Sequence, residues 1–88
     1  SDQATGTPIT GASVDATTVA NAGDSFTISL MAPKMFYFSN NGANACDVFP
    51  PSSGTINGGA ADAAISVAAA ASYIFTSNDG FVWLAALQ

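Results

Sequence analysis

Two short segments of the sequence, residues 35–38 (MFYF) and 81–87 (FVWLAAL), place large apolar side chains at consecutive positions. Successive side chains of a β-strand point to opposite faces, so both faces of each predicted strand are apolar. A chain of 88 residues makes one small domain, and its single core covers only one face of each strand. We therefore expect another protein surface to cover the second face. The residues expected in this oligomer interface are Met35, Phe36, Tyr37, Phe38, Phe81, Val82, Trp83 and Leu84.

Two other interpretations of these strands stay open at this point. The strands can be ordinary core, or an exposed aromatic side chain can act as a platform for a sugar. Each large apolar side chain left in water forgoes about 1.5 to 3 kcal/mol. Contact between identical subunits, most simply in a closed cyclic oligomer, is the interpretation that we favour.

The sequence offers few other ways to stabilise so small a domain. Cys46 is the only cysteine, so no disulfide forms within the chain, and we expect this thiol to be a small buried apolar group. The six aspartates are scattered and there is no histidine or glutamate, so we predict no metal site and no cofactor. Oligomerisation is the stabilising device that remains.

The charge balance excludes several classes of partner. Lys34 is the single basic residue against six aspartates, which gives a net charge of −5. Nucleic-acid binding depends on Lys and Arg at phosphates, so we expect no nucleic-acid partner and no anionic membrane surface. Only 8% of the residues are charged, so the surface must consist largely of Ser, Thr, Asn, Ala and Gly. No segment is predicted to target or span a membrane.

The side chains that most enzymes use are also scarce. General acid–base catalysis near neutral pH usually falls to His, to tuned Glu or Lys, or to Cys paired with His. The chain has no histidine, no glutamate, one lysine and one cysteine. Without a base, a serine nucleophile would not be activated. We expect a protein that binds or builds, with no catalytic residues.

The pattern of apolar and turn residues predicts a small antiparallel β-sandwich or barrel, jelly-roll-like, of about seven to eight short strands. Residues 1–11 are small and polar and are expected to form a flexible N-terminal arm; residues 12–88 form the β-sandwich domain. The predicted strands cover residues 13–19, 25–31, 35–39, 45–49, 55–57, a segment near 63–67, 72–77 and 81–87. Loops with Asn-Gly and Asp-Gly predict hairpins at residues 40–44 and 78–80.

Residues 60–71 (AADAAISVAAAA) are the ambiguous part of the chain. Alanine is the best helix former, and the run contains no glycine or proline, so local propensity alone favours a helix. The alternation of Ala63, Ile65 and Val67 favours a strand instead. We predict strand, loop, strand, with a helix as the alternative.

One long stretch of the sequence resembles a short β-domain that recurs in structural proteins of tailed bacteriophages. There a segment of the form N-x-G-x-N-x-x-x-V-F/Y-P-x-x-G-x-x-I-N-G leads through an Ala-rich stretch to a last strand with Trp. The residues here that match are Asn41, Ala43, Asn44, Val48, Phe49, Pro50, Gly54, Ile56, Asn57, Gly58 and Trp83. The chain departs from the pattern in having only alanine at 68–71, where the resemblance implies a glycine, and in being almost devoid of Arg and Lys.

The resemblance implies a capsid decoration, or cement, protein of the virion. Such a protein binds the major capsid protein on the outer shell, often as a homotrimer, and is made in the cytoplasm of the bacterial host. The candidate capsid contacts are Ser1, Asp2, Gln3, Ala4 and Thr5. The alternative function is a receptor- or glycan-binding module of a tail fibre or spike, with Tyr37, Tyr73 or Trp83 stacking on the sugar.

Overall fold

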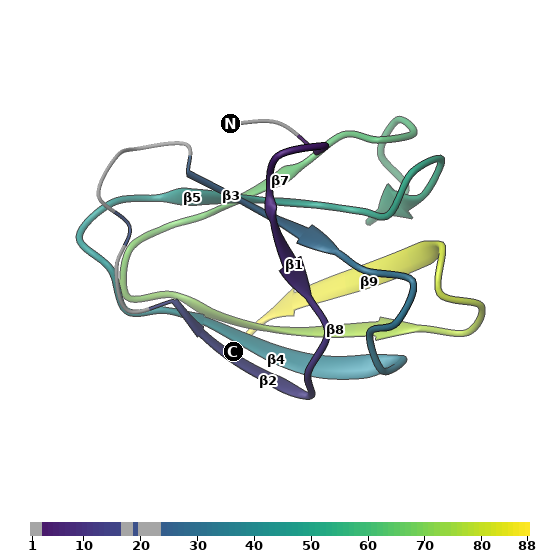
Figure 1. Ribbon diagram of the computed structural model, residues 1–88. Helices are drawn as coiled ribbons and strands as arrows, with labels where there is room; N and C mark the ends of the chain where they lie inside the picture. The colour runs from purple at the N-terminus through teal and green to yellow at the C-terminus, as the bar shows by residue number, and fades with distance from the viewer. Residues whose placement is uncertain (1–2, 17–18, 20–23) are drawn as a thin grey trace.

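A computed structural model describes residues 3–16, 19 and 24–88, which form two β-sheets packed face to face (Figure 1). The four-stranded sheet contains, in spatial order, β1 (Thr7–Ile9), β3 (Asp24–Ile28), β5 (Cys46–Phe49) and β7 (Ile65–Val67). The five-stranded sheet contains β2 (Ser13–Ala16), β4 (Met35–Asn40), β8 (Ser72–Ser77), β9 (Val82–Leu87) and β6 (Thr55–Ile56). The prediction of a small all-β domain is confirmed.

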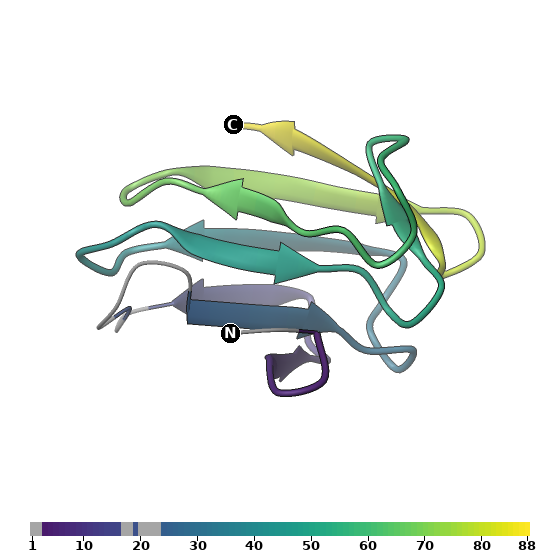
Figure 2. The same ribbon diagram turned by 90° about the horizontal axis from the view of Figure 1, so that it is seen from above.

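The two sheets are mixed, whereas the sequence predicted antiparallel pairing. Strands β1 and β3, β2 and β4, β3 and β5, and β6 and β9 pair in parallel. Strands β4 and β8, β5 and β7, and β8 and β9 pair antiparallel. Parallel neighbours arise because the chain alternates between the sheets, so a strand often returns beside one that ran in the same direction. Figure 2 shows the strands of the two layers running nearly in line.

The loop at residues 40–44 shows how this alternation works, and the hairpin predicted there is wrong. Strand β4 belongs to the five-stranded sheet and β5 to the four-stranded sheet, so the loop crosses between the layers. Asn40 is fully buried at the start of the crossing. Its Nδ2 donates to the carbonyls of Asn44 and Val67, and its Oδ1 accepts from the N–H of Gly42. The buried amide is therefore satisfied and ties the crossing to β7.

The core lies between the sheets and is rich in aromatic rings. Phe36 on β4 stacks on Phe75, its direct neighbour on β8, with ring centroids 4.8 Å apart. Trp83 on β9 meets the same Phe36 edge to face at 5.3 Å. Phe26 from the opposite sheet contacts Phe38 at 5.0 Å. Of these three contacts, that between Phe26 and Phe38 joins the two sheets, and the remaining buried core is aliphatic apart from Cys46.

The described part of the expected N-terminal arm belongs to the sandwich. Strand β1 lies in residues 7–9 and pairs with β3, and Ile9 is buried in the core. The Gln3 side chain donates to the carbonyl of Pro50 at 2.8 Å and to Asp62 Oδ1 at 2.9 Å. The boundary at residue 12 is therefore misplaced, because Ile9 supplies apolar area that an exposed arm would leave in water.

The Ala-rich segment forms a turn, β7, a second turn and β8, as predicted, and the helical alternative is wrong. Asp62 and Ala70 have φ angles of 67° and 67°, in the left-handed region that a right-handed helix excludes. The Ala70 N–H donates to the Asn40 carbonyl at 2.8 Å, and the Ala71 N–H to the Ala68 carbonyl at 3.1 Å. These long-range and turn bonds replace the helical ones that alanine favours locally.

Most strand boundaries differ from the prediction by one or two residues, and those of β2 and β3 differ by three. Strand β3 ends at Ile28, so Leu30, which falls within the strand predicted over residues 25–31, lies exposed in the following turn. Strand β2 ends at Ala16, and the rest of the strand predicted over residues 13–19 lies largely outside the described residues. The hairpin joining β8 to β9 is confirmed.

Candidate interaction surface

The two strands predicted to be apolar on both faces divide cleanly between the core and the surface. Phe36 and Phe38 on β4 and Trp83 on β9 are fully buried inside the monomer. These three residues were expected in an oligomer interface, and that expectation is wrong for them, because their aromatic rings pack against the opposite sheet and each other. One face of each strand is thus used by the chain's own core.

The other face of these strands is open to solvent. Met35 and Tyr37 on β4 are 53% and 49% exposed, and Val82 and Leu84 on β9 are 55% and 61% exposed. Phe81 is also exposed but precedes β9, in the hairpin connection. Four of the eight predicted interface residues therefore share one exposed sheet surface, where nothing in the described chain covers them.

Strand pairing places three further residues on the same surface. Ile74 on β8 lies opposite Tyr37 on one side and Ala86 on the other. Thr76 lies between Met35 and Leu84. We call this surface the outer face and define it by its residues on three adjacent strands: Met35, Tyr37, Ile74, Thr76, Val82, Leu84 and Ala86. The sequence analysis missed Ile74, Thr76 and Ala86, although their alternation with Phe75 and Trp83 is a usable signal.

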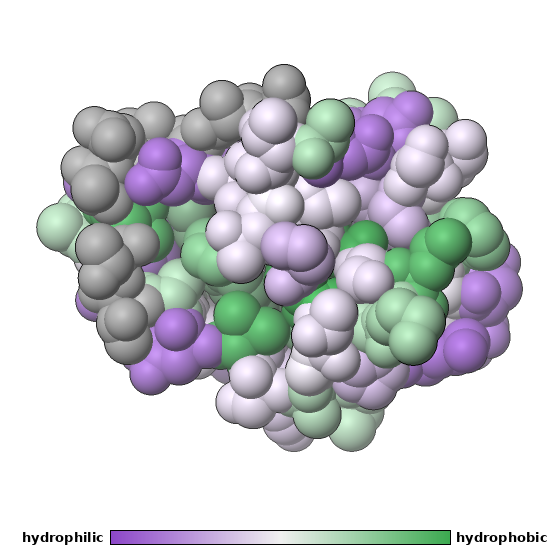
Figure 3. All heavy atoms as spheres, viewed as in Figure 1, coloured by the Kyte–Doolittle hydropathy of each residue, from purple (hydrophilic) through white to green (hydrophobic). Residues whose placement is uncertain are grey.

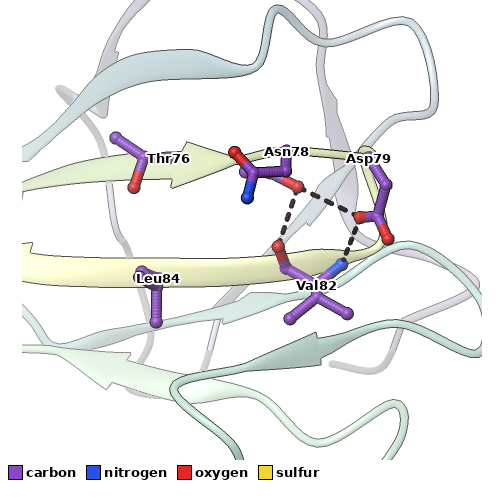
Figure 4. A pocket seen from close by; sticks show the side chains of 6 residues that line it. Thr76, Asn78, Asp79, Val82 and Leu84 are labelled. Atoms are coloured by element: carbon purple, nitrogen blue, oxygen red, sulfur yellow. Dashed lines mark hydrogen bonds between the residues drawn. The ribbon is translucent and has the colours of Figure 1, made fainter.

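The outer face has a hollow beside the β8–β9 hairpin (Figure 4). Thr76, Val82 and Leu84 line a groove of about 290 Å³, which Ser77, Asn78 and Asp79 complete at the turn end. The Ser77 and Asp79 side chains of the turn are engaged within the hairpin. Asp79 Oδ1 accepts from the N–H groups of Phe81 and Val82 at 2.9 and 3.0 Å. The Ser77 hydroxyl donates to the Val82 carbonyl at 2.7 Å.

Three ionisable groups have pKa values shifted by their surroundings in the fold. The backbone N–H groups of Val82 and Phe81 lower the pKa of Asp79 below its usual range. Hydrogen bonds from the Gln3 side chain and the Ser53 N–H lower the pKa of Asp62 in the same way. Burial, with Asp47 and Asp24 nearby, raises the pKa of the Cys46 thiol to about 11. This thiol is fully buried, and the raised pKa keeps it protonated and unreactive.

The described residues contain no arrangement suited to metal binding. No group of three His, Cys, Asp or Glu side chains comes together in residues 3–16, 19 and 24–88. The same residues contain no helix able to span a lipid bilayer. The side of the molecule in Figure 3 carries mainly residues of intermediate hydropathy, with separate strongly polar and strongly apolar areas.

The residues singled out for sugar stacking have different surroundings. Trp83 is buried, and its indole N–H donates to the Gly80 carbonyl at 3.0 Å. Tyr73 is half-buried beside Phe75, with ring centroids 6.2 Å apart. Tyr37 alone of these three is exposed. A stacking platform built on Trp83 would require the core to open.

The candidate capsid contacts lie at the start of the chain. Ser1 and Asp2 are outside the described residues. Gln3 is held against the domain, since its carbonyl also accepts from the Thr27 hydroxyl at 2.7 Å. Ala4 and Thr5 are exposed in the turn before β1.

Comparison of the chain with protein-family models, curated proteins and solved structures finds no match.

Proposed function

We propose that this protein is a structural component of a bacteriophage virion, a decoration protein that binds the outer shell of the capsid as an oligomer and stabilises it. The observation that carries the proposal is the outer face. Its large apolar side chains stand on strands whose inner side chains already fill the core. Such a surface on a small domain is typical of a protein that works in contact with other subunits.

The remaining chemistry supports a binding role. Asp79 is hydrogen-bonded within its own turn, Asp62 accepts from the Gln3 side chain and the Ser53 N–H, and the thiol is buried and protonated. A decoration protein needs no catalytic group, because many weak contacts repeated over a lattice provide its strength. The virion part of the proposal rests on the sequence resemblance. Its matching residues are core and turn residues in the fold: Val48, Ile56 and Trp83 are buried, and Asn57 and Gly58 have positive φ.

The test uses phage particles that carry the gene for this chain. Quantitative mass spectrometry of purified particles should find the chain at a copy number of the same order as the shell subunit. Particles made without the chain should release their DNA at a lower temperature, and purified protein added back should restore the original temperature. A copy number matching that of tail fibres, or particles of unchanged stability, would refute the proposal.

A further inference from the structure

We propose that Asn57 is a modification site: its side-chain amide is deamidated through attack by the backbone nitrogen of Gly58, and the product no longer closes the edge of β9. The sequence contains two Asn-Gly pairs, Asn41-Gly42 and Asn57-Gly58. Glycine has no Cβ, so its backbone nitrogen can approach the preceding Asn side chain closely. The two pairs share this local chemistry, and their surroundings in the fold decide which of them reacts.

The reaction needs only water. The Gly58 nitrogen forms a bond to Asn57 Cγ and loses its proton. The bond from Cγ to Nδ2 breaks, and the amide nitrogen leaves as ammonia with that proton. Water then opens the cyclic succinimide at one of its two carbonyls. The product is aspartate, or isoaspartate, in which the main chain continues through the former side chain. Both products are ionised at neutral pH and carry one more negative charge than asparagine.

The attacking nitrogen of the Asn57-Gly58 pair is unengaged. Both residues are exposed, with φ angles of 55° and 73°, in a turn where the Gly59 N–H donates to the Ile56 carbonyl at 3.1 Å. Among the described residues, the Gly58 N–H has no hydrogen-bond acceptor. Beyond its chain neighbours, no atom lies within 4 Å of the position that a Cβ on Gly58 would occupy. Packing therefore does not hinder movement of this turn.

The Asn57 amide is held by bonds that water can replace. Its Nδ2 donates to the Ala85 carbonyl at 3.0 Å, and its Oδ1 accepts from the Ala85 N–H at 2.8 Å. Both bonds are exposed to solvent. When they open, water takes the place of each partner, so the net cost is small. The amide can therefore turn from Ala85 to the Gly58 nitrogen without leaving a buried polar group unpaired.

The Asn41-Gly42 pair is protected by comparison. The Gly42 N–H donates to Asn40 Oδ1 at 3.0 Å, and Asn40 is fully buried. Attack by this nitrogen would leave the buried oxygen without its donor, which costs more than exchanging an exposed bond for water. Gly42 is also packed against Val19, since a Cβ on Gly42 would lie 2.6 Å from the Val19 nitrogen. Asn41 Nδ2 itself donates to Asp15 Oδ1 at 2.6 Å.

Deamidation changes the edge of β9. Strand β6 pairs with Val82 and Trp83, and the Asn57 side chain pairs with Ala85 further along the same edge. An aspartate at this position has no donor for the Ala85 carbonyl and turns a second oxygen toward it. An isoaspartate also lengthens the main chain of the turn. In both products the Ala85 carbonyl loses its partner, and the edge of β9 opens.

The experiment incubates the purified wild-type protein at mildly alkaline pH in water enriched in heavy oxygen. Peptide mass spectrometry then follows each Asn-Gly pair, because every deamidation incorporates one oxygen from the water. In the folded protein, Asn57 should convert at least about tenfold faster than Asn41. In concentrated urea, which removes the contacts of both pairs, the two rates should become similar. An absence of conversion at Asn57, conversion of Asn41 at an equal or higher rate, or a ratio unchanged by urea would overturn the inference.

Two variants measure the consequence for the fold. Asn57→Asp places one reaction product in every molecule and should lower the melting temperature by at least about 4 °C. Asn78→Asp is the matched control, since Asn78 is exposed at the other end of β9 and makes no hydrogen bond among the described residues. It should lower the melting temperature by less than half as much. Equal effects of the two variants would overturn the second part of the inference.

Ageing of the protein provides a test that does not depend on folding of Asn57→Asp. The melting temperature of the wild type should fall during the incubation as the converted fraction of Asn57 rises. Asn57→Gly cannot be deamidated at this position, and glycine tolerates the positive φ, so its melting temperature should stay constant over the same incubation. An equal decline in both proteins, or no decline in the wild type, would contradict the link between deamidation and the edge of β9.

Discussion

Replacing Ala70 with glycine should raise the free energy of unfolding by about 0.5 to 1 kcal/mol. Ala70 is exposed and has a φ of 67°. The Ala71 N–H to Ala68 carbonyl bond closes a four-residue turn with Ala70 at its third position. A positive φ at that position is the mark of a type II turn, which favours glycine there.

The magnitude follows from two opposing effects. The left-handed conformation costs an L-residue roughly 1–2 kcal/mol, and glycine removes that cost. Glycine also has more conformational freedom in the unfolded chain, which lowers the free energy of unfolding by about 0.5–1 kcal/mol. Ala69, the preceding turn residue, is exposed and is not among the residues with positive φ. Ala69→Gly should therefore lower stability by about 0.5–1 kcal/mol, because only the second effect operates.

Urea unfolding followed by circular dichroism measures both variants against the wild type. The measurement is made at one protein concentration, since association would add to the apparent stability of every variant. The two variants should differ by about 1–2 kcal/mol, or roughly 4–8 °C or more in melting temperature for a domain of this size. If Ala70→Gly is as destabilised as Ala69→Gly, the strain argument is wrong.

Two further predictions concern β9 and its hairpin. Asn57 has a φ of 55°, and its amide donates to the Ala85 carbonyl at 3.0 Å and accepts from the Ala85 N–H at 2.8 Å. In urea unfolding, Asn57→Ala should lower the free energy of unfolding by about 2–3 kcal/mol. Asn57→Gly should lower it by about 1 kcal/mol less, because glycine tolerates the positive φ. Equal losses in the two variants would contradict this prediction. The lowered pKa of Asp79 adds stability above its ordinary value of 3.8 that is lost as the pH falls below it. Wild-type stability should drop on acidification, and Asp79→Asn should drop less; parallel profiles would count against the hydrogen-bonded carboxylate.

The sequence shows that residues 68–71 contain no glycine. The structure shows the consequence of this absence at Ala70. The resemblance implied a glycine in this turn, and Ala70 now occupies a conformation that glycine prefers. The helical alternative failed at the same place, because the Ala70 N–H bonds to Asn40, 30 residues earlier. Propensity describes a residue and its neighbours, so it contains no information about such a partner.

Strand pairing was the part that the sequence could not predict. The Asn-rich loop after β4 carries the local signal of a hairpin, yet β4 pairs with β2 and β8, while β5 joins the other sheet. The fully buried Asn40 side chain makes this crossing stable by bonding to Val67, 27 residues away. A sequence pattern specifies which residues can lie in a strand, but neighbours in a sheet are selected by contacts distant in the chain.

Four of the seven outer-face residues were predicted from the sequence. The other three depend on strand pairing, which the sequence did not predict. Alternation separates Met35 and Tyr37 from Phe36 and Phe38, but it does not say which pair lies inside. The structure decides this through ring contacts between the sheets, such as that of Phe38 with Phe26. Pairing then adds Ile74 between Tyr37 on β4 and Ala86 on β9.

The edge of β9 is closed to a strand from another chain by a side chain of the same molecule. Strand β6 covers only Val82 and Trp83, which leaves the edge open at Ala85. The Asn57 side chain fills this position with one donor and one acceptor, as a strand residue would. An added strand from another chain would have to displace that amide, so lateral extension here is disfavoured.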